Sequence, residues 1–463
     1  MVQTQELAGR GRSGQEPAPA YAKMHTWDNY SAQLMVEFEQ SCDEGKDIEG
    51  LKGLFEAVAA LPDGQEKADL ADVLYHMVLK APQRADYAYE EPSDYEAIQH
   101  LCAHNGAPGV PAAALREHIR GAWYGRICGC LLGKPIEGFW MTEMLPLLKG
   151  TGNWPMHTYI AQGAITPELR AQFNFDVYNR CYADTLDCAP ADDDTNYTVL
   201  ASELINRYGR DFTTHDVATL WLDAQPKAAY CTAERATFRN LVNGYLPPDT
   251  ALYKNPYREW LGAQIRGDYF GYINPGNPAA AAEMAWRDAR LSHVKNGIYG
   301  EMFVAAMLAW AAVSQEPEEV ICAGLAEIPR TSRLHESVSQ VLAWWRQGES
   351  YEQAIQHVYA RYNDQNIHHW DHTLSNAMIV AIALLYGGGD YGKSICLAVQ
   401  SAFDTDCNGA TVGSVVGMMR GFSAIGEEWL EPVHGMLNTD IFGVGKIGVE
   451  ELVDRTMGHI CAG

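Results

Sequence analysis

The sequence has few basic residues and no long apolar run. It holds 34 Lys and Arg against 59 Asp and Glu, a formal net charge of −25 over 463 residues. Nucleic acids and anionic membranes bind basic surfaces, so this balance argues against both as partners. The longest strongly apolar runs, 303–313 and 378–385, are shorter than the roughly 20 residues of a membrane span. We therefore expect neither a nucleic-acid nor a membrane partner, and the oligomeric state is left open.

Other common signals are missing as well. Residues 1–20 are polar and rich in Gly and Pro, without the apolar stretch of a secretory signal. The eleven cysteines form no pair of CxxC motifs, which argues against a zinc site and, with the missing signal, predicts reduced thiols and a cytoplasmic location. The sequence contains neither a Gly-rich phosphate-binding loop nor a Gly-x-Ser-x-Gly nucleophile motif. Nucleotide hydrolysis by a P-loop and serine-esterase chemistry are therefore not expected.

The chain is instead rich in helical patterns. Residues 1–24 are predicted to be a disordered leader, and 25–110 a helical extension containing three amphipathic helices. Residues 111–463 are rich in Ala, Leu, Met and Gly at helical spacing, and alternating β-branched runs are scarce. We predict an all-α fold. The two long segments rich in Pro, Gly and Tyr, 151–190 and 247–278, have the length of functional loops.

Two series of glycines at a spacing of four stand out. Glycine inside a helix costs about 0.5–1 kcal/mol relative to alanine, so each series predicts close approach of another backbone. Glu137 lies just after the first series, and Asp404 and Asp406 lie just before the second. We expect these acids to come together if the two helix ends converge, and to be separated if the helices pack antiparallel; the sequence does not choose between the two. The glycines are Gly121, Gly125, Gly129 and Gly133, then Gly409, Gly413, Gly417 and Gly421.

A third acidic cluster, Asp192-Asp193-Asp194, precedes an apolar run and is predicted to begin a helix. Three adjacent carboxylates repel one another unless a cation compensates them. With Glu137, Asp404 and Asp406 they provide six carboxylates, the donor type that Mg²⁺, Ca²⁺ and Mn²⁺ prefer. Six are enough for two ions about 3.5–4 Å apart, as in two-metal hydrolytic sites.

These motifs, in this order, resemble the ADP-ribosylglycohydrolase family, which includes the dinitrogenase-reductase-activating glycohydrolase. Residues 125–137 are similar to the family's glycine-rich helix ending in Pro-x-Glu. Asp192-Asp193-Asp194-Thr195 is similar to its Thr-Asp-Asp-Thr motif, and Asp404-Thr405-Asp406-Cys407 to its Asp-Thr-Asp-Thr motif. A weaker likeness runs from Gly271 to Gly297. The resemblance covers about residues 111–460 and leaves the preceding extension without a counterpart.

The resemblance implies an all-helical domain with a central cleft that holds two Mg²⁺ or Mn²⁺ ions. It implies hydrolysis of an N- or O-glycosidic bond to a ribosyl group, above all ADP-ribosyl, on a small molecule or a protein. Glu137 would be a ligand that swings away as substrate enters, and Glu137 or Asp193 would move the proton. The implied metal ligands are Asp192, Asp193, Asp194, Asp404 and Asp406.

Four residues depart from the family pattern. Asp192 stands where Thr is usual, Cys407 replaces the last Thr of the second acidic motif, and Cys130 replaces an Asp. Lys134 stands where a small residue is common, and it can pair with a substrate anion or with Glu137. Two alternatives therefore remain: the same fold acting on a riboside or pentoside without ADP, and a non-catalytic member that binds a nucleotide sugar or a partner.

Further candidates come from the polar residues of the middle and C-terminal segments. Asn277, in the loop rich in Gly and Pro, and His293 are candidate substrate contacts; packing is the alternative role for His293. His368, His369 and His372 have a spacing compatible with a metal, although the acidic motifs already account for metal binding. A substrate contact is the candidate role for His369 or His372, of which we select His369, and a surface or helix-capping role is the default for these histidines.

Overall fold

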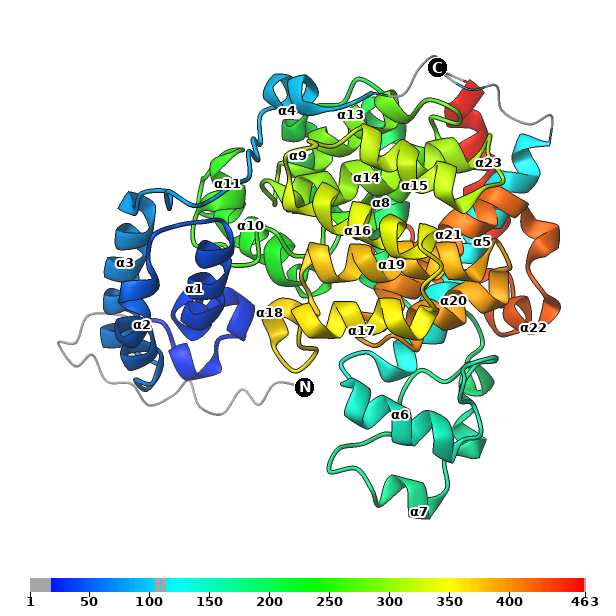
Figure 1. Ribbon diagram of the computed structural model, residues 1–463, viewed down its shortest axis with the longest axis horizontal. Helices are drawn as coiled ribbons and strands as arrows, with labels where there is room; N and C mark the ends of the chain where they lie inside the picture. Colours follow the sequence, from blue (N-terminus) through cyan, green and yellow to red (C-terminus); the bar gives the residue numbers. More distant parts are fainter. Residues whose placement is uncertain (1–17, 105–108, 110–113, 462–463) are drawn as a thin grey trace. The chain divides into compact units, whose positions relative to one another are not determined.

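The computed structural model describes residues 18–104, 109 and 114–461, and it divides into two compact units, Met1–Ala85 and Asp86–Gly463 (Figure 1). The sequence placed the domain boundary near residue 110. Residues 86–104 instead pack with the second unit, where the Glu91 carboxylate lies 2.8 Å from an Arg333 nitrogen. Most of the predicted leader, residues 1–17, falls outside the described residues, and Tyr21–Lys23 forms a short 3-10 helix.

The first unit contains the three amphipathic helices predicted for it: α1 (Leu34–Asp43), α2 (Lys52–Ala59) and α3 (Gln65–Lys80). Phe38 and Phe55 meet with ring centroids 5.3 Å apart, and Leu74 of α3 is also buried. The turn Pro62-Asp63-Gly64 separates α2 from α3, because neither proline nor glycine favours continuation of a helix.

The second unit is a helical assembly. Its first helices are α4 (Tyr95–Leu101), α5 (Leu115–Gly133), α6 (Met141–Gly150), α7 (Pro167–Arg170), α8 (Asp193–Tyr208), α9 (Thr214–Ala224), α10 (Thr232–Val242), α11 (Asp249–Leu252), α12 (Asp268–Tyr272) and α13 (Pro278–Ala289). They are followed by α14 (Asn296–Ala311), α15 (Pro317–Ala326), α16 (Arg333–Arg346), α17 (Tyr351–Arg361), α18 (Ile367–Trp370), α19 (Thr373–Gly387), α20 (Tyr391–Val399), α21 (Thr405–Arg420), α22 (Glu427–Leu430) and α23 (Val449–Cys461).

The strands β1 (Met436–Asn438) and β2 (Lys446–Gly448) form an antiparallel hairpin, with Leu437 opposite Ile447. This hairpin is the whole sheet content of the part of the chain that the structure describes. The predicted all-α class is therefore confirmed.

The centre of the second unit is built from α14 and α19, whose side chains are buried on almost every face. These two helices contain the apolar runs noted in the sequence, and a helix that is apolar on all sides belongs in the core of a large domain. Among the described helices, none combines the length and apolar character needed to cross a bilayer.

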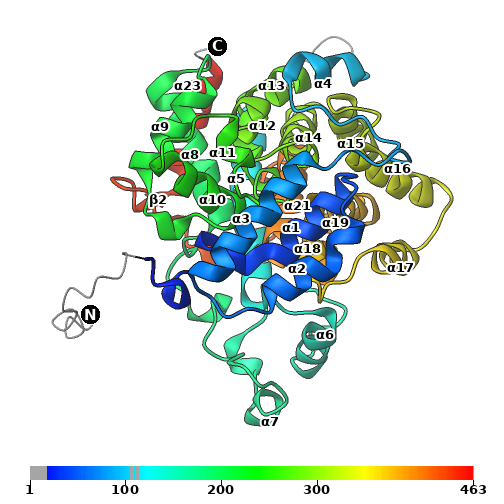
Figure 2. The same cartoon turned by 90° about the vertical axis from the view of Figure 1, so that its left-hand side faces the viewer.

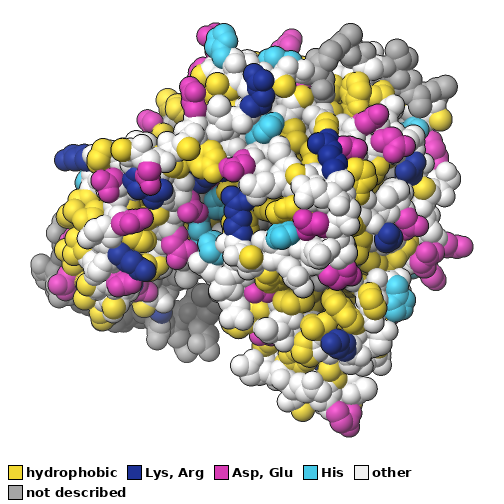
Figure 3. Space-filling model, viewed as in Figure 1, with side chains coloured by type: hydrophobic (Ala, Val, Ile, Leu, Met, Phe, Trp, Pro, Cys, Tyr) yellow, Lys and Arg dark blue, Asp and Glu magenta, His cyan; other side chains and the backbone are white. Residues whose placement is uncertain are grey.

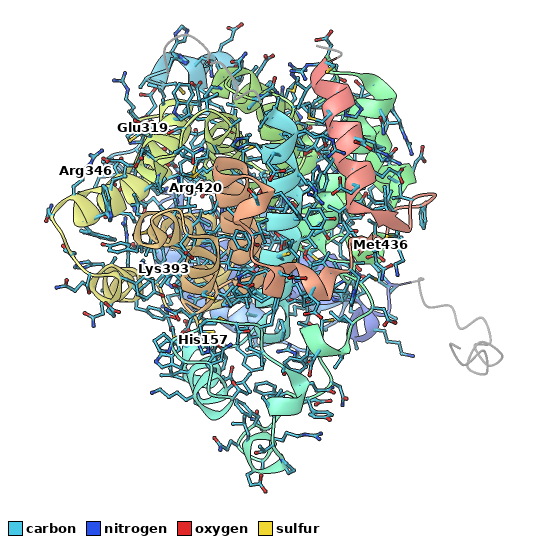
Figure 4. All side chains as sticks on the ribbon, turned by 90° about the vertical axis from the view of Figure 1, so that its right-hand side faces the viewer. His157, Glu319, Arg346, Lys393, Arg420 and Met436 are labelled. Atoms are coloured by element: carbon cyan, nitrogen blue, oxygen red, sulfur yellow. The ribbon has the colours of Figure 1, made fainter. Side chains whose placement is uncertain are left out.

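The two glycine series face each other along α5 and α21, coloured cyan and orange in Figure 1. A Cβ built on Gly121 would lie 2.2 Å from the Gly417 carbonyl oxygen, and one built on Gly129 would lie 2.0 Å from that of Gly409. Only glycine permits such contact between main chains. The order of these contacts makes the helices antiparallel, and Arg420 marks the end of α21 in Figure 4.

Candidate functional site

The end of α5 meets the start of α21. Gly133, the last residue of α5, lies against the backbone of Thr405 and Asp406, and the Thr405 hydroxyl donates a hydrogen bond to the Gly133 carbonyl oxygen at 3.0 Å. Antiparallel packing thus brings the acidic ends together. The expectation that it would separate them was wrong, because antiparallel neighbours place the C-terminus of one helix beside the N-terminus of the other.

The acidic triplet begins α8, as the sequence predicted. Asp192 is the N-cap, and its side chain accepts a hydrogen bond from the Asp194 amide at 2.9 Å. Asp194 is fully buried and is held by the Arg126 guanidinium of α5, whose Nη2 lies 3.1 Å from its Oδ1. Arg126 also pairs with Asp268 at 2.9 Å. Helix α8 is therefore fixed to α5 by a buried ion pair immediately behind the acids.

Lys134 lies among carboxylates from all three motifs. Its Nζ is 2.5 Å from Asp192 Oδ2, 2.6 Å from Glu137 Oε2 and 3.3 Å from Asp406 Oδ2. The Asp192 and Asp406 side chains are 1% and 2% exposed, whereas Glu137 is 41% exposed. The site thus has a buried interior made by two aspartates and a solvent-facing edge at Glu137.

Several carboxylate oxygens of this group have no hydrogen-bond partner although they are buried. They include Asp194 Oδ2, Asp404 Oδ1 and Asp406 Oδ1. Potential ligand atoms lie within 4.8 Å of one another in two groups that share Asp406; these are Cys130, Asp192, Asp194 and Asp406, and Asp404, Asp406 and Cys407. Buried, unpaired carboxylate oxygens are costly unless a cation binds them. The donor set therefore fits a hard divalent cation, although thiols contribute little to such a site.

The electrostatics of the group also favour an added cation. Burial, together with Asp406 and Asp371, raises the pKa of Asp404 well above its usual value. Burial and Asp192 raise the pKa of Asp193 to about 7, and burial and Asp406 raise that of Glu137 to about 7. One lysine therefore leaves the surrounding negative charge only partly compensated.

Two contributors to this group, Asp371 and Arg126, were missed in the sequence. Asp371, between α18 and α19, is buried, and its pKa is raised by burial and by Glu234, Asp193, Glu137 and Asp406. Arg126 lies within the first glycine series and looked like an ordinary helix residue. No periodicity in the sequence distinguishes such residues, because their role depends on what the fold places opposite them.

The backbone before Asp404 is unusual. Ala402 and Phe403 have φ angles of 60° and 56°, in the left-handed region that non-glycine residues rarely adopt. Both residues are fully buried, so the surrounding core maintains this conformation. Backbone strain of this kind is concentrated at functional sites.

The remaining predicted site residues occupy other positions. Asn277 is the N-cap of α13 and accepts a hydrogen bond from the Ala280 amide at 3.3 Å. His293 is buried beside Ser292, whose hydroxyl lies 2.8 Å from its Nδ1, at an ionic cluster centred on Arg266. Asn277 thus caps a helix, and His293 is packed in the interior. Their contacts with substrate stay predictions.

The three histidines near residue 370 use their Nδ1 atoms within the fold. His368 Nδ1 accepts from the Trp260 indole at 3.0 Å, His369 Nδ1 from the Asn363 amide at 3.1 Å, and His372 Nδ1 from the Leu374 amide at 3.2 Å. The predicted substrate contact of His369 is untested. His372 has a capping role at the start of α19.

The long segment before the acidic triplet forms, with α6 and α7, a lobe that protrudes in both Figure 1 and Figure 2, and its buried side chains, Leu147 and Leu169 among them, belong to the hydrophobic core of the unit. Phe139, Phe173 and Phe175 form an aromatic cluster there, with Phe139 and Phe175 centroids 5.0 Å apart. Arg180 lies over the Phe139 ring and donates to the Glu137 carbonyl oxygen at 3.1 Å. Hydrophobic side chains cover much of this lobe in Figure 3. The lobe therefore places an aromatic cluster, of which Phe175 is the exposed ring, near the Glu137 main chain.

The sequence of the second unit is similar to that of a known protein family. The sequence model of the ADP-ribosylglycohydrolase family matches residues 111–461. A solved structure titled "ADP-ribosylglycohydrolase-related protein complex" is similar with a TM-score of 0.47 and 18% identity, covering 75% of this chain and 98% of that chain. The search of curated proteins gave no match.

Proposed function

Because the chain belongs to the ADP-ribosylglycohydrolase family, we propose that it is a metal-dependent hydrolase that cleaves an N- or O-glycosidic bond at the anomeric carbon of a ribosyl group. The observation that carries this proposal is the convergence of three acidic motifs around unpaired, buried carboxylate oxygens. A packing role does not account for oxygens that lack partners, whereas cation binding does.

The proposed cation ligands are Asp192, Asp193, Asp194, Asp404 and Asp406, with Mg²⁺ or Mn²⁺ as the cofactor and two ions as the family's number. A bound ion of this kind lowers the pKa of a coordinated water and fixes its position. The protein supplies buried carboxylates that do not move, because the glycine contacts of α5 and α21 and the buried Arg126 fix their helices.

Glu137 and Asp193 are the proposed proton-transfer groups. The pKa of Glu137 is raised to about 7, so this side chain is able to accept or donate a proton near neutral pH. The pKa of Asp193 is also raised to about 7, and a cation bound to Asp193 would lower it. Glu137 is the more exposed of the acids around Lys134 and lies at the end of a 3-10 helix that follows α5. This position is suited to an acid that meets the substrate as it enters.

ADP-ribosyl is the substrate that we propose first. The aromatic cluster near Glu137 supports it, because its exposed ring, Phe175, 37% exposed, can stack on a nucleobase. A riboside or pentoside without ADP, and ligand binding without catalysis, are the alternatives. Asn277, His293 and His369 remain proposed substrate contacts within this scheme.

The test is the double variant Asp404→Asn/Asp406→Asn. It should lose metal binding in calorimetry and lose turnover, while the helical circular dichroism stays unchanged. The matched control Glu427→Gln/Glu428→Gln removes two exposed carboxylates from α22 and should behave as the wild type. Full metal affinity in the aspartate variant would contradict the assignment of the site.

Titration of ADP-ribose with Mg²⁺, and again with EDTA, then separates the substrate hypotheses. Metal-dependent heat supports ADP-ribosyl substrates and directs the next assays to arginine- and serine-linked ADP-ribose. Binding of Mg²⁺ without any heat from ADP-ribose favours smaller ribosides. Ligand binding that is indifferent to EDTA, with no product released, favours a non-catalytic role.

A further inference from the structure

The positively charged side chain of Lys134 lies where the divalent ions are expected. The Lys134 ammonium contacts one carboxylate oxygen each from Asp192, Asp406 and Glu137. These three side chains come from three different segments, the start of α8, the start of α21 and the end of the 3-10 helix after α5. Three convergent oxygens within 3.3 Å form a coordination shell typical of a bound cation rather than of a surface lysine.

The shell overlaps the ligand groups of the site. Asp192 and Asp406 both belong to the group of potential ligand atoms that lie within 4.8 Å of one another, and Asp406 also joins the second group. The ammonium contacts the Oδ2 atoms of both aspartates, so those oxygens are already compensated by a positive charge. A divalent ion bound at the same oxygens would be repelled by the ammonium at contact distance.

We propose that Lys134 takes the place of one of the two metal ions, so that this chain binds a single divalent cation. The inference rests on the proposed function, because it concerns the same site. The remaining ion is assigned to the group of potential ligand atoms from Asp404, Asp406 and Cys407, where Asp404 Oδ1 and Asp406 Oδ1 are buried without a partner.

The position of Lys134 is imposed by the backbone. It directly follows Gly133, which is in contact with the main chain of Thr405 and Asp406. The Thr405 hydroxyl bonds to the Gly133 carbonyl oxygen and closes this junction. The lysine side chain is only 21% exposed, and its nitrogen lies beside carboxylates that are almost wholly buried. The ammonium is therefore a built part of the site.

The replacement of a metal ion by the Lys134 ammonium also explains two departures from the family pattern, Lys134 and Asp192. Asp192, which stands where the family has Thr, provides the shortest contact to Lys134. Lys134 and Asp192 add opposite charges at the same place, so the charges of these two residues cancel. The pair also holds the Glu137 carboxylate at 2.6 Å from the ammonium, in place of the ion that would otherwise bind it.

The test is the stoichiometry of Mn²⁺ binding, measured by equilibrium titration and by electron paramagnetic resonance of the bound ion. The wild-type chain should bind one Mn²⁺ with the spectrum of an isolated ion. Lys134→Met should bind two and show the spin coupling of neighbouring ions. Lys393→Met removes an exposed lysine of α20, labelled in Figure 4, and should bind one.

Each outcome decides whether Lys134 takes the place of one metal ion. Two coupled ions in the wild type overturn the inference and leave the proposed function in place. A single ion in a folded Lys134→Met variant also overturns it, because the ammonium would then not be what excludes the second ion. If that variant does not fold, the wild-type stoichiometry decides alone. Failure of the wild type to bind Mn²⁺ or Mg²⁺ overturns the metal-dependent function and the inference with it.

Discussion

Replacement of Gly129 by alanine tests whether contact between the α5 and α21 backbones fixes the site. The new Cβ would lie 2.0 Å from the Gly409 carbonyl oxygen, whereas distances below 3.0 Å are essentially never observed. The helices must therefore separate by about 1 Å (3.0 − 2.0) at this point. The neighbouring atom belongs to the backbone and cannot rotate away. The destabilisation should therefore lie at the upper end of the range for overpacking substitutions, about 3 kcal/mol.

Alanine also gains about 1 kcal/mol of helix propensity over glycine. The expected net loss in the free energy of unfolding is therefore about 2 kcal/mol. The variant should also bind metal more weakly, because Gly129 lies one helical turn, about 6 Å along the axis, from Gly133 and its contact with Asp406. Urea denaturation measures the first effect and calorimetry with Mg²⁺ the second.

Gly458→Ala is the matched control. Gly458 lies in α23 and is exposed, and a Cβ added there would meet no neighbouring atom within 4 Å. Alanine should stabilise this helix by about 0.5–1 kcal/mol and leave metal affinity unchanged. If Gly129→Ala also stabilises the protein, the helices do not meet at the backbone and the reasoning is refuted.

Three further results are expected. Arg126→Met should lower the free energy of unfolding by about 3–5 kcal/mol in chemical denaturation, because it leaves Asp194 and Asp268 buried without their partner; a loss below about 1 kcal/mol would contradict this. Burial and Asp288 raise the pKa of Glu301 well above 4.5, so its contribution to stability is present below pH 4.5 and decreases as the pH rises. Glu301→Gln should therefore gain stability relative to the wild type between about pH 5 and 8, whereas a constant difference would refute the assignment. Mg²⁺ at about 100 times its dissociation constant should raise the free energy of unfolding of the wild type by about 2.7 kcal/mol, and EDTA should reverse this increase. Mg²⁺ should not stabilise the Asp404→Asn/Asp406→Asn variant.

The sequence was informative where a pattern repeats or where a motif marks a helix end. The glycine spacing predicted close backbone contact, and the acidic motifs predicted the starts of α8 and α21, because both depend on local helix geometry. The helical class, predicted from residues rich in Ala, Leu, Met and Gly at helical spacing, and the family, given by the resemblance of three motifs, are both confirmed.

What the sequence did not provide were relations across the fold. We expected antiparallel packing of α5 and α21 to separate the acidic residues, whereas it brings them together. Asp371 lies near these acids but comes from a segment without an acidic motif. Lys134 was recognised as a departure from the family, but its place between Asp192 and Asp406 depends on two other segments. Side-chain partners of this kind are set by tertiary packing and leave no periodicity to detect.

The glycine contacts of α5 and α21 have a consequence for how this protein can change. Because main-chain atoms set the distance between the two helices, that distance does not vary with the side chains around them. Substitutions in the aromatic lobe would therefore leave the spacing of the acidic residues at the two helix ends unchanged. Under the proposed function, a library of variants confined to residues 139–180 would change side chains that meet the substrate while the spacing of the carboxylates stays constant.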